Sequence, residues 1–209
     1  MKKFMALLLV AGMTLSLTAC GGSTDTAKTD QADGKDTFTV GFDQDFPPFG
    51  YVGDDGEFTG FDIEMATECA ARMGKKIVLQ PIDWDAKDME LEAGTIDCIW
   101  NGFTMNGRED QYTWTDPYMD NSQVVVVKKD SGINTLADLA GKVVEVQKES
   151  AAETALNDEE HADLMASFAQ LLSVGEYNTA FMDLESGAVD AVAIDIGVAQ
   201  FQIEGKEDQ

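Results

Sequence analysis

A loop rich in glycine, asparagine and threonine carries the residues best suited to bind an anion. It spans residues 101–108 and directly follows the apolar segment 96–100 (IDCIW), which is typical of a buried strand. In open α/β sheets, ligands bind at loops of this kind. Gly102 frees the local backbone, Thr104 offers a hydroxyl, and the Arg108 guanidinium can hold a carboxylate through two parallel hydrogen bonds. The spacing therefore predicts a carboxylate site, although a surface turn with a solvated arginine would have the same sequence.

The segments before this loop alternate between strand and helix patterns, and glycines follow both helical segments. The expected strands are residues 37–42, 76–80 and 96–100, the expected helices are residues 62–73 and 85–93, and a small hairpin is expected over residues 51–58 after a proline-rich loop. The apolar face of the first helix would carry Met65, Ala66, Cys69 and Met73. This order predicts a parallel sheet flanked by helices, with right-handed crossovers.

After a strongly β-branched strand at residues 122–128, the same pattern restarts. The expected helices are residues 135–139, 150–156 and 178–185, and the expected strands are residues 142–147, 171–174 and 189–194, with a polar, acidic stretch at residues 157–163. Ser150 can act as the N-cap of its helix. Two similar α/β halves joined at one strand predict two lobes hinged there, with a cleft between them.

The first twenty residues have the organisation of a lipoprotein signal. Lys2 and Lys3 precede an apolar segment that runs to about Leu17 and is too short to cross a membrane. The segment ends in LTAC, which resembles the bacterial lipoprotein signal, where Cys20 would become the lipid-modified N-terminus. We therefore expect a signal peptide at residues 1–19 and a lipid anchor on Cys20.

The rest of the chain divides into a tether and a folded part. Residues 20–36 contain almost no apolar side chains after Cys20 and cannot bury enough surface to fold. Residues 37–209 are long enough for one large domain or two small lobes. We expect lobe 1 at residues 37–123 and lobe 2 at residues 124–209.

The composition excludes several classes of partner. The chain has 14 Lys and Arg against 39 Asp and Glu, a net charge of −25, and such a surface repels nucleic acid and anionic headgroups. Its one histidine, His161, and the spacing of Cys69 and Cys98 fit no metal site, so no metal or cofactor is expected. Both thiols are expected in the core, and an extracytoplasmic location would also allow a disulfide between them.

The segment Gly60–Met65 (GFDIEM), with Ala70 and Met73 in phase behind it, resembles the signature of family 3 bacterial solute-binding proteins. These are the polar-amino-acid receptors of ABC importers. The resemblance covers nearly all of residues 37–209, although Cys69 stands at a usually aliphatic position. It implies an α/β fold of the type II periplasmic-binding-protein kind. Each of the two lobes would be a mostly parallel sheet flanked by helices, with the ligand cleft between them.

The resemblance also implies a set of ligand-binding residues from both lobes. They are Asp43, Phe46, Trp84, Gly102, Thr104, Arg108, Gln147, Ser150, Ala151 and Asp195. In the first lobe, Asp43 and Phe46 would touch the ligand side chain, Trp84 would stack over the ligand, and the loop of Gly102, Thr104 and Arg108 would bind its α-carboxylate.

In the second lobe, the turn of Gln147, Ser150 and Ala151 would offer N–H groups, and Asp195 would receive the α-ammonium. Each role has a plainer alternative in which the two aromatic rings are core residues, Asp43 belongs to a turn, and Asp195 caps the following helix. A zwitterion held between Arg108 and Asp195 would pull the two lobes together.

Three features depart from the family pattern. Thr104 and Arg108 are four residues apart where five is usual, so we infer a one-residue deletion and a tight turn at Asn106–Gly107. Glu149 stands where glycine is common and adds negative charge near the site. Family members also continue further and return to the first lobe, so we expect that this chain is truncated after Gln209.

The expected protein is a monomeric, extracytoplasmic, lipid-anchored receptor that delivers a polar or charged amino acid to the permease subunits of an ABC importer. Asp43 would favour a cationic or hydrogen-bonding ligand side chain. One alternative is an enzyme, because the same fold hosts cyclohexadienyl dehydratases, but the sequence has no nucleophile elbow, P-loop or histidine dyad. A third interpretation is a ligand-sensing lipoprotein.

Overall fold

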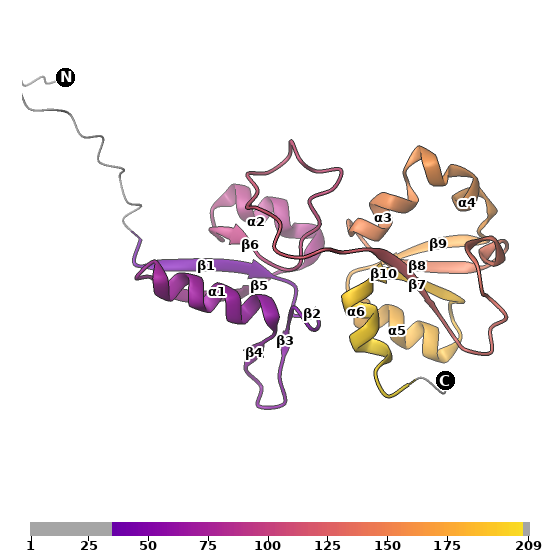
Figure 1. The fold of residues 1–209 in the computed structure, drawn as a ribbon, viewed down its shortest axis with the longest axis horizontal. Helices are drawn as coiled ribbons and strands as arrows, with labels where there is room; N and C mark the ends of the chain where they lie inside the picture. The colour runs from indigo at the N-terminus through magenta and orange to yellow at the C-terminus, as the bar shows by residue number, and fades with distance from the viewer. Residues whose placement is uncertain (1–34, 207–209) are drawn as a thin grey trace, which may run out of the picture. The chain divides into compact units, whose positions relative to one another are not determined.

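The computed structural model describes residues 35–206. The expected signal peptide, Cys20 and nearly all of the expected tether lie outside this range. Within it, two mixed α/β lobes are arranged around separate sheets (Figure 1). No helix of residues 35–206 has the length and apolar character needed to cross a bilayer.

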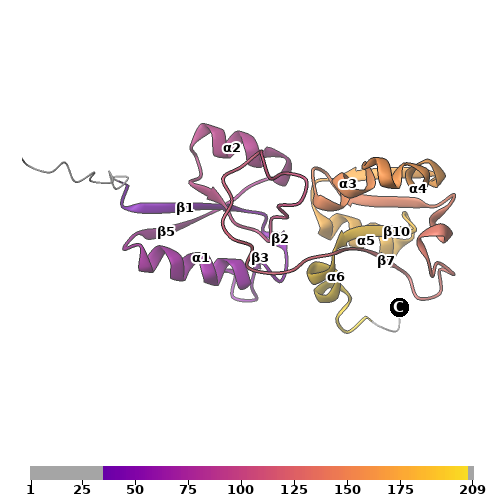
Figure 2. The same cartoon turned by 45° about the horizontal axis from the view of Figure 1, so that its top comes forward.

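The first sheet is parallel and has three strands in the order β5-β1-β6. Its strands are β1 (Thr37–Phe42), β5 (Lys76–Pro81) and β6 (Cys98–Ile99). The connections are α1 (Phe61–Arg72) and the 3-10 turn η1 (Trp84–Ala86) with α2 (Lys87–Ala93). Figure 2 shows α1 and α2 on opposite faces of this sheet. The predicted parallel sheet is confirmed, although only two residues of the segment 96–100 pair as a strand.

Helix α1 buries Ala66 as expected but differs from the expected stripe at its end. Ile63, Ala66 and Ala70 face the core, whereas Met73 is 48% exposed, because it is the C-cap residue where the chain leaves the helix. Gly60 precedes the helix at φ 124°, and a Cβ there would lie 2.4 Å from the backbone oxygen of Phe49. Only glycine therefore allows this close approach of the two segments.

A small antiparallel sheet, β2-β3-β4, follows β1. Its strands are β2 (Asp45–Phe46), β3 (Gly50–Val52) and β4 (Phe58–Thr59). The hairpin of β3 and β4 was predicted. Strand β2 was predicted as a loop because of the following prolines, but it ends before Pro47 and pairs with β3 over only two residues, so the prolines remove no ladder bond.

The second sheet has four strands in the order β7-β10-β8-β9. They are β7 (Gln123–Val127), β8 (Val143–Gln147), β9 (Gln170–Val174) and β10 (Ala191–Asp195). Strand β7 is antiparallel to β10, and the other pairs are parallel. Because β7 begins at Gln123, the last residue of the expected first lobe already pairs in this sheet.

Helices cover both faces of the second sheet and build two cores. They are α3 (Ala151–Leu156), α4 (Ala162–Ser167), α5 (Tyr177–Ser186) and α6 (Ile196–Ile203). Side chains of β10 alternate between the cores, since Val192 and Ile194 pack with α5 and α6, and Ala191 and Ala193 pack with α3. The fully buried strand predicted at residues 189–194 is confirmed over Ala191–Asp195.

Two connections differ from the expectation. The predicted helix at residues 135–139 is a 3-10 turn, η2 (Leu136–Leu139), which begins at a capping box between Thr135 and Asp138. The acidic stretch contains η3 (Glu159–His161) and runs into α4, a helix that was not predicted. Leu164 and Met165 of α4 pack against the second core, although the surrounding polar residues hide any apolar period.

Candidate functional site

Nine of the ten predicted ligand-binding residues line one small cavity. It takes residues from both lobes and has a volume of about 20 Å³, room for about one water molecule. The lining residues are Phe46, Trp84, Asn101, Gly102, Phe103, Thr104, Arg108, Gln147, Ser150, Ala151 and Asp195. The remaining predicted residue, Asp43, lies beside this cavity and lines a second one. The ligand-contacting roles of all ten residues stay predictions.

Arg108 is buried and its guanidinium donates to both lobes. Its side chain is 8% exposed; Nη1 donates to the Thr104 carbonyl at 3.2 Å, and Nη2 donates to the Glu149 carbonyl at 3.1 Å and to Thr154 Oγ1 at 3.0 Å. The Phe103 ring lies 5.2 Å from the guanidinium carbon and shields it from water. The alternative of a solvated surface arginine is therefore wrong.

The loop of Arg108 is held from two directions. The Arg108 N–H donates to the Met105 carbonyl at 2.9 Å, which closes the predicted turn, and Gly107 has φ 78°. The Gly102 N–H donates at 3.2 Å to the Tyr118 hydroxyl, which in turn donates at 2.9 Å to Asp62 in α1. The Gly102 N–H was expected to bind a ligand, but in this conformation it donates to the Tyr118 hydroxyl instead.

Asp195 sits at the N-cap position of α6 but does not cap it through its side chain. Its Oδ1 accepts hydrogen bonds from Asn121 and, at 2.7 Å, from Gln123 Nε2. Burial raises the pKa of the Asp195 carboxyl, while these two bonds and the nearby Arg108 charge oppose the increase. The carboxylate thus faces the cavity from the lobe opposite to Arg108, as an ammonium acceptor would.

The two predicted aromatic residues line the cavity and also pack against protein. Phe46 stacks on Phe49 at 5.6 Å between centroids and belongs to a core cluster. Trp84 meets Phe103 edge-on at 5.1 Å, and its indole Nε1 donates to the Glu149 carbonyl at 3.3 Å. Phe46 is therefore a core residue, as the alternative interpretation states, and it also lines the cavity.

Asp43 and Gln147 form a buried contact between the lobes. Gln147 Nε2 donates to Asp43 Oδ2 at 2.6 Å and to the Gly175 carbonyl at 2.9 Å, while Asp43 Oδ1 accepts the Asp45 N–H at 2.8 Å. Burial is the main cause that raises the pKa of Asp43 to about 6. Asp43 thus closes a turn, as the plainer alternative states, and also contacts the second lobe.

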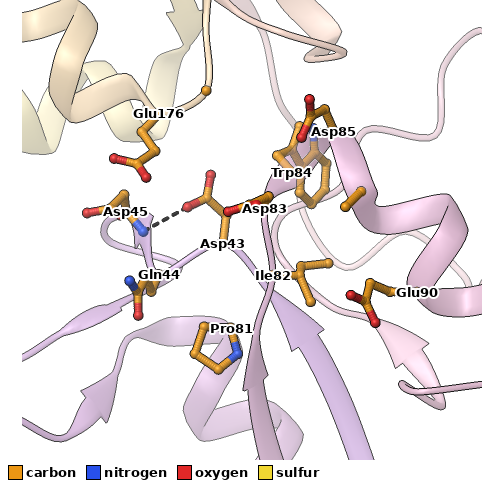
Figure 3. Close-up of a pocket in the computed structure, with 12 residues that line it drawn as sticks. Asp43, Gln44, Asp45, Pro81, Ile82, Asp83, Trp84, Asp85, Glu90 and Glu176 are labelled. Atoms are coloured by element: carbon orange, nitrogen blue, oxygen red, sulfur yellow. Dashed lines mark hydrogen bonds between the residues drawn. The ribbon is translucent and has the colours of Figure 1, made fainter.

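A larger cavity of about 400 Å³ lies on the other side of Asp43. Figure 3 shows the Asp43 carboxyl among other acidic side chains that line it. They are Asp45, Asp83, Asp85, Glu90 and Glu176, and Trp84 lines this cavity as well as the small one. Since none of its lining residues is basic, the cavity suits a cationic group and disfavours an anionic one.

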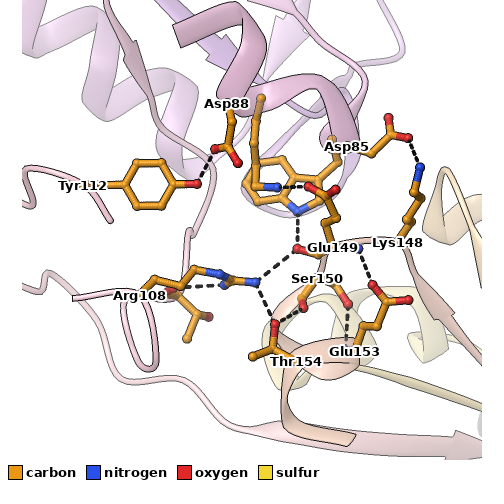
Figure 4. A network of polar contacts seen from close by, with 12 residues as sticks. Asp85, Asp88, Arg108, Tyr112, Lys148, Glu149, Ser150, Glu153 and Thr154 are labelled. Atoms are coloured by element: carbon orange, nitrogen blue, oxygen red, sulfur yellow. Dashed lines mark hydrogen bonds and ion pairs between the residues drawn. The ribbon is translucent and has the colours of Figure 1, made fainter. Parts of the chain in front are cut away.

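The turn before α3 combines a helix cap with an unusual backbone. Ser150 Oγ accepts the Glu153 N–H at 3.1 Å, which confirms the predicted N-cap. Glu149, at the usual glycine position, has φ 57°, the only non-glycine residue in the described chain with a positive φ. Its carboxylate pairs with Lys87 at 2.7 Å, so the extra negative charge is balanced by a cation of the first lobe (Figure 4).

Further polar residues line or touch the site and were not predicted, among them Lys87, Asn101, Asn121, Gln123 and Thr154. Thr154 lies one helical turn after Ser150, so helical spacing could have identified it. Lys87 gives no such signal, because a lysine near the start of a helix is ordinarily exposed, whereas this side chain is 3% exposed.

Possible metal ligands and the two thiols were the remaining reactive groups named from the sequence. Among residues 35–206, no group of His, Cys, Asp and Glu side chains is arranged to hold a metal ion. Cys69 and Cys98 are both free thiols, and the Cys69 thiol lies 3.8 Å from the sulfur of Met73.

The chain is similar to known proteins over most of its described length. A family described as "bacterial extracellular solute-binding proteins, family 3" matches residues 38–181. The arginine-binding extracellular protein ArtP of Bacillus subtilis is 36% identical over 148 residues, which is 70% of this chain and 56% of ArtP. The L-cystine-binding protein TcyJ of Escherichia coli K12 is 31% identical over 194 residues, 91% of this chain and 69% of TcyJ.

A solved structure has the same fold. The histidine-bound substrate-binding protein of an ABC uptake transporter from Streptococcus pneumoniae has a TM-score of 0.77 and 36% identity, covering 82% of this chain and 70% of that one. This chain thus spans little more than half of the first of these relatives and about seven tenths of the other two.

Proposed function

Because this chain belongs to the bacterial extracellular solute-binding proteins of family 3, we propose that it is a receptor that binds a free amino acid between its lobes and delivers it to an ABC importer. The observation that carries the proposal is the burial of Arg108 and Asp195 in the walls of one cavity, on different lobes. A guanidinium and a carboxylate so placed match the two charges of an amino-acid zwitterion. Binding such a ligand would draw the lobes together.

We further propose that the preferred ligand has a cationic side chain. The side-chain end of the site would lie toward Asp43 and the acidic cavity, whose carboxylates attract a guanidinium, ammonium or imidazolium group. Two of the three similar proteins agree with this class, since ArtP is named as arginine-binding and the pneumococcal structure contains histidine, whereas TcyJ is named for L-cystine.

The remaining expectations are proposals of the same kind. We place the lobe boundary directly before β7, which begins at Gln123, the lipid anchor on Cys20 and the protein outside the cytoplasm, as a monomer. The family description supports the extracytoplasmic location. We propose no catalytic activity, and incubation with prephenate or arogenate should yield no product.

Thermal unfolding in the presence of each of the twenty amino acids tests the proposal. A ligand at about 100 times its dissociation constant stabilises the folded state by about 2.7 kcal/mol, which is roughly 5–10 °C for a protein of this size. We expect the largest shifts with basic amino acids. A cooperative transition that no amino acid moves would refute the proposal.

Arginine variants supply the matched control. Arg108→Ala should abolish the shift, whereas Arg72→Ala, which replaces an exposed arginine of α1 that pairs with Glu68, should retain it. Micromolar binding by Arg108→Ala would mean that Arg108 does not bind the ligand, and the proposed receptor function would still stand.

A further inference from the structure

Glu149 contacts three side chains of the first lobe through two different groups, and Figure 4 shows its contact with Arg108. Its carboxylate Oε2 lies 2.7 Å from Lys87 Nζ. Its backbone carbonyl accepts hydrogen bonds from Trp84 Nε1 at 3.3 Å and from Arg108 Nη2 at 3.1 Å. The side chain and the carbonyl of Glu149 therefore both hold the same turn against the first lobe.

Lys87 makes this contact strong. Its side chain is 3% exposed, its ammonium lies 5.3 Å from the centre of the Trp84 ring, and it forms an ion pair with Glu149. A buried ammonium that loses its carboxylate is strongly unfavourable, because the charge stays desolvated without compensation. Separation of the lobes would return the ammonium to water.

The backbone of Glu149 indicates that this turn is held under tension. Its φ of 57° lies in the region that favours glycine, and such residues persist where surrounding contacts fix them. Besides the bonds to the first lobe, the Glu149 N–H donates to Glu153 Oε2 at 2.6 Å. The neighbouring pair of Lys148 and Asp85 also crosses between the lobes, but the two side chains are 55% and 37% exposed, so this ion pair adds little stability.

Arg108 cannot grip a carboxylate with two bonds while this arrangement persists. Both bidentate edges of a guanidinium, Nη1 with Nη2 and Nε with Nη2, use a hydrogen of Nη2. Both Nη2 hydrogens are already donated, one to the Glu149 carbonyl and one to Thr154. The adjoining cavity of about 20 Å³ is also too small for any amino acid.

We propose that Glu149 is an affinity-determining residue that competes within the chain for Arg108, anchored there by Lys87. The inference rests on the proposed function, since the competing group is the α-carboxylate of the solute. The Glu149 carbonyl occupies the position of one carboxylate oxygen, and the Lys87–Glu149 pair keeps the lobes closed over it. We call the Lys87–Glu149 pair, together with the bonds that the Glu149 carbonyl accepts, the latch. A solute binds only after this turn is displaced, so the apparent affinity of the protein is lowered in proportion to the fraction of molecules in which the latch is formed.

Two measurements test the inference on the purified protein. Small-angle X-ray scattering without added amino acid should show a larger radius of gyration for Glu149→Gln than for the parent protein. Calorimetric titration with arginine should show that Glu149→Gln binds more tightly, by about 5–150-fold, the usual range of coupling between two equilibria. Glu68→Gln, which removes the same charge from an ion pair within α1, should change neither quantity.

The double variant separates the latch from a general effect of the substitution. Lys87→Met removes the buried charge at nearly the same length, so Glu149→Gln in that background should alter neither the radius nor the affinity. If Glu149→Gln behaves as the parent protein does, or acts equally with and without Lys87, the inference is overturned. If no variant binds any amino acid, the proposed function fails, while the scattering comparison still tests the latch.

Discussion

Replacement of Asp43 by asparagine should change how the stability of the protein depends on pH. Burial, with smaller contributions from Asp45 and Glu176, raises the pKa of Asp43 from 3.8 to about 6. The folded state therefore binds this proton more tightly than the unfolded state does. Between about pH 4 and pH 6, stability from this group falls as pH rises, because ionisation in the folded protein carries the cost of desolvation.

The structure sets the size of this effect. The interval between 3.8 and about 6 corresponds to about 3 kcal/mol, of which about 2 kcal/mol develops between pH 4 and pH 7. Asp43→Asn has no proton to lose, so it escapes this penalty. Any fixed cost of the substitution, such as a weakened bond to Gln147, is present at both pH values and cancels in the difference.

Urea unfolding of both proteins at pH 4 and pH 7 gives the required free energies. The free energy of unfolding of Asp43→Asn, relative to the parent protein, should rise by about 2 kcal/mol between the two pH values. Asp54→Asn, in the exposed turn between β3 and β4, controls for the loss of one carboxylate. If the free energy of unfolding of Asp43→Asn differs from that of the parent protein by the same amount at pH 4 and pH 7, the conclusion that folding desolvates the Asp43 carboxyl is refuted.

Three further substitutions test single contacts. Asp195→Asn should weaken amino-acid binding by about 2–5 kcal/mol in a calorimetric titration, and a negligible loss would mean that the ammonium binds elsewhere. Ser150→Ala should lower the free energy of unfolding by about 1 kcal/mol, and Ser150→Thr should retain most of it; equal losses would argue against the cap. Tyr118→Phe should cost about 1–3 kcal/mol in urea unfolding, because it removes a partner from the buried carboxylate of α1, and an unchanged midpoint would contradict that bond.

Strand and helix order could be predicted from the sequence because most elements have a clear local signal. The helical period before Gly74 and the Ser150 cap are properties of short segments, and the structure has elements at both places. Helix α4 was missed because it is only six residues long and its acidic neighbours suggested a loop. The short pairing of β2 depends on its partner strand rather than on its own residues.

The site was predictable in its residue types and not in its contacts. The loop of Arg108 has a recognisable composition, and the resemblance to a family located Asp195. The Lys87–Glu149 pair joins residues 62 positions apart on different lobes, and no local pattern specifies such a contact. The partners of Asp195 depend on the antiparallel register that sets Gln123 opposite it, which only the folded sheet defines.

The acidic cavity beside Asp43 has a consequence for the rate of capture. Its carboxylates add a local negative potential to a chain whose net charge is −25, so under the proposed function a cationic solute would be attracted toward this cavity before any specific contact forms. Added salt screens this attraction beyond about 8 Å at physiological ionic strength. Encounter with a basic amino acid is therefore faster in dilute media than in saline ones, whereas a neutral amino acid arrives at nearly the same rate in both.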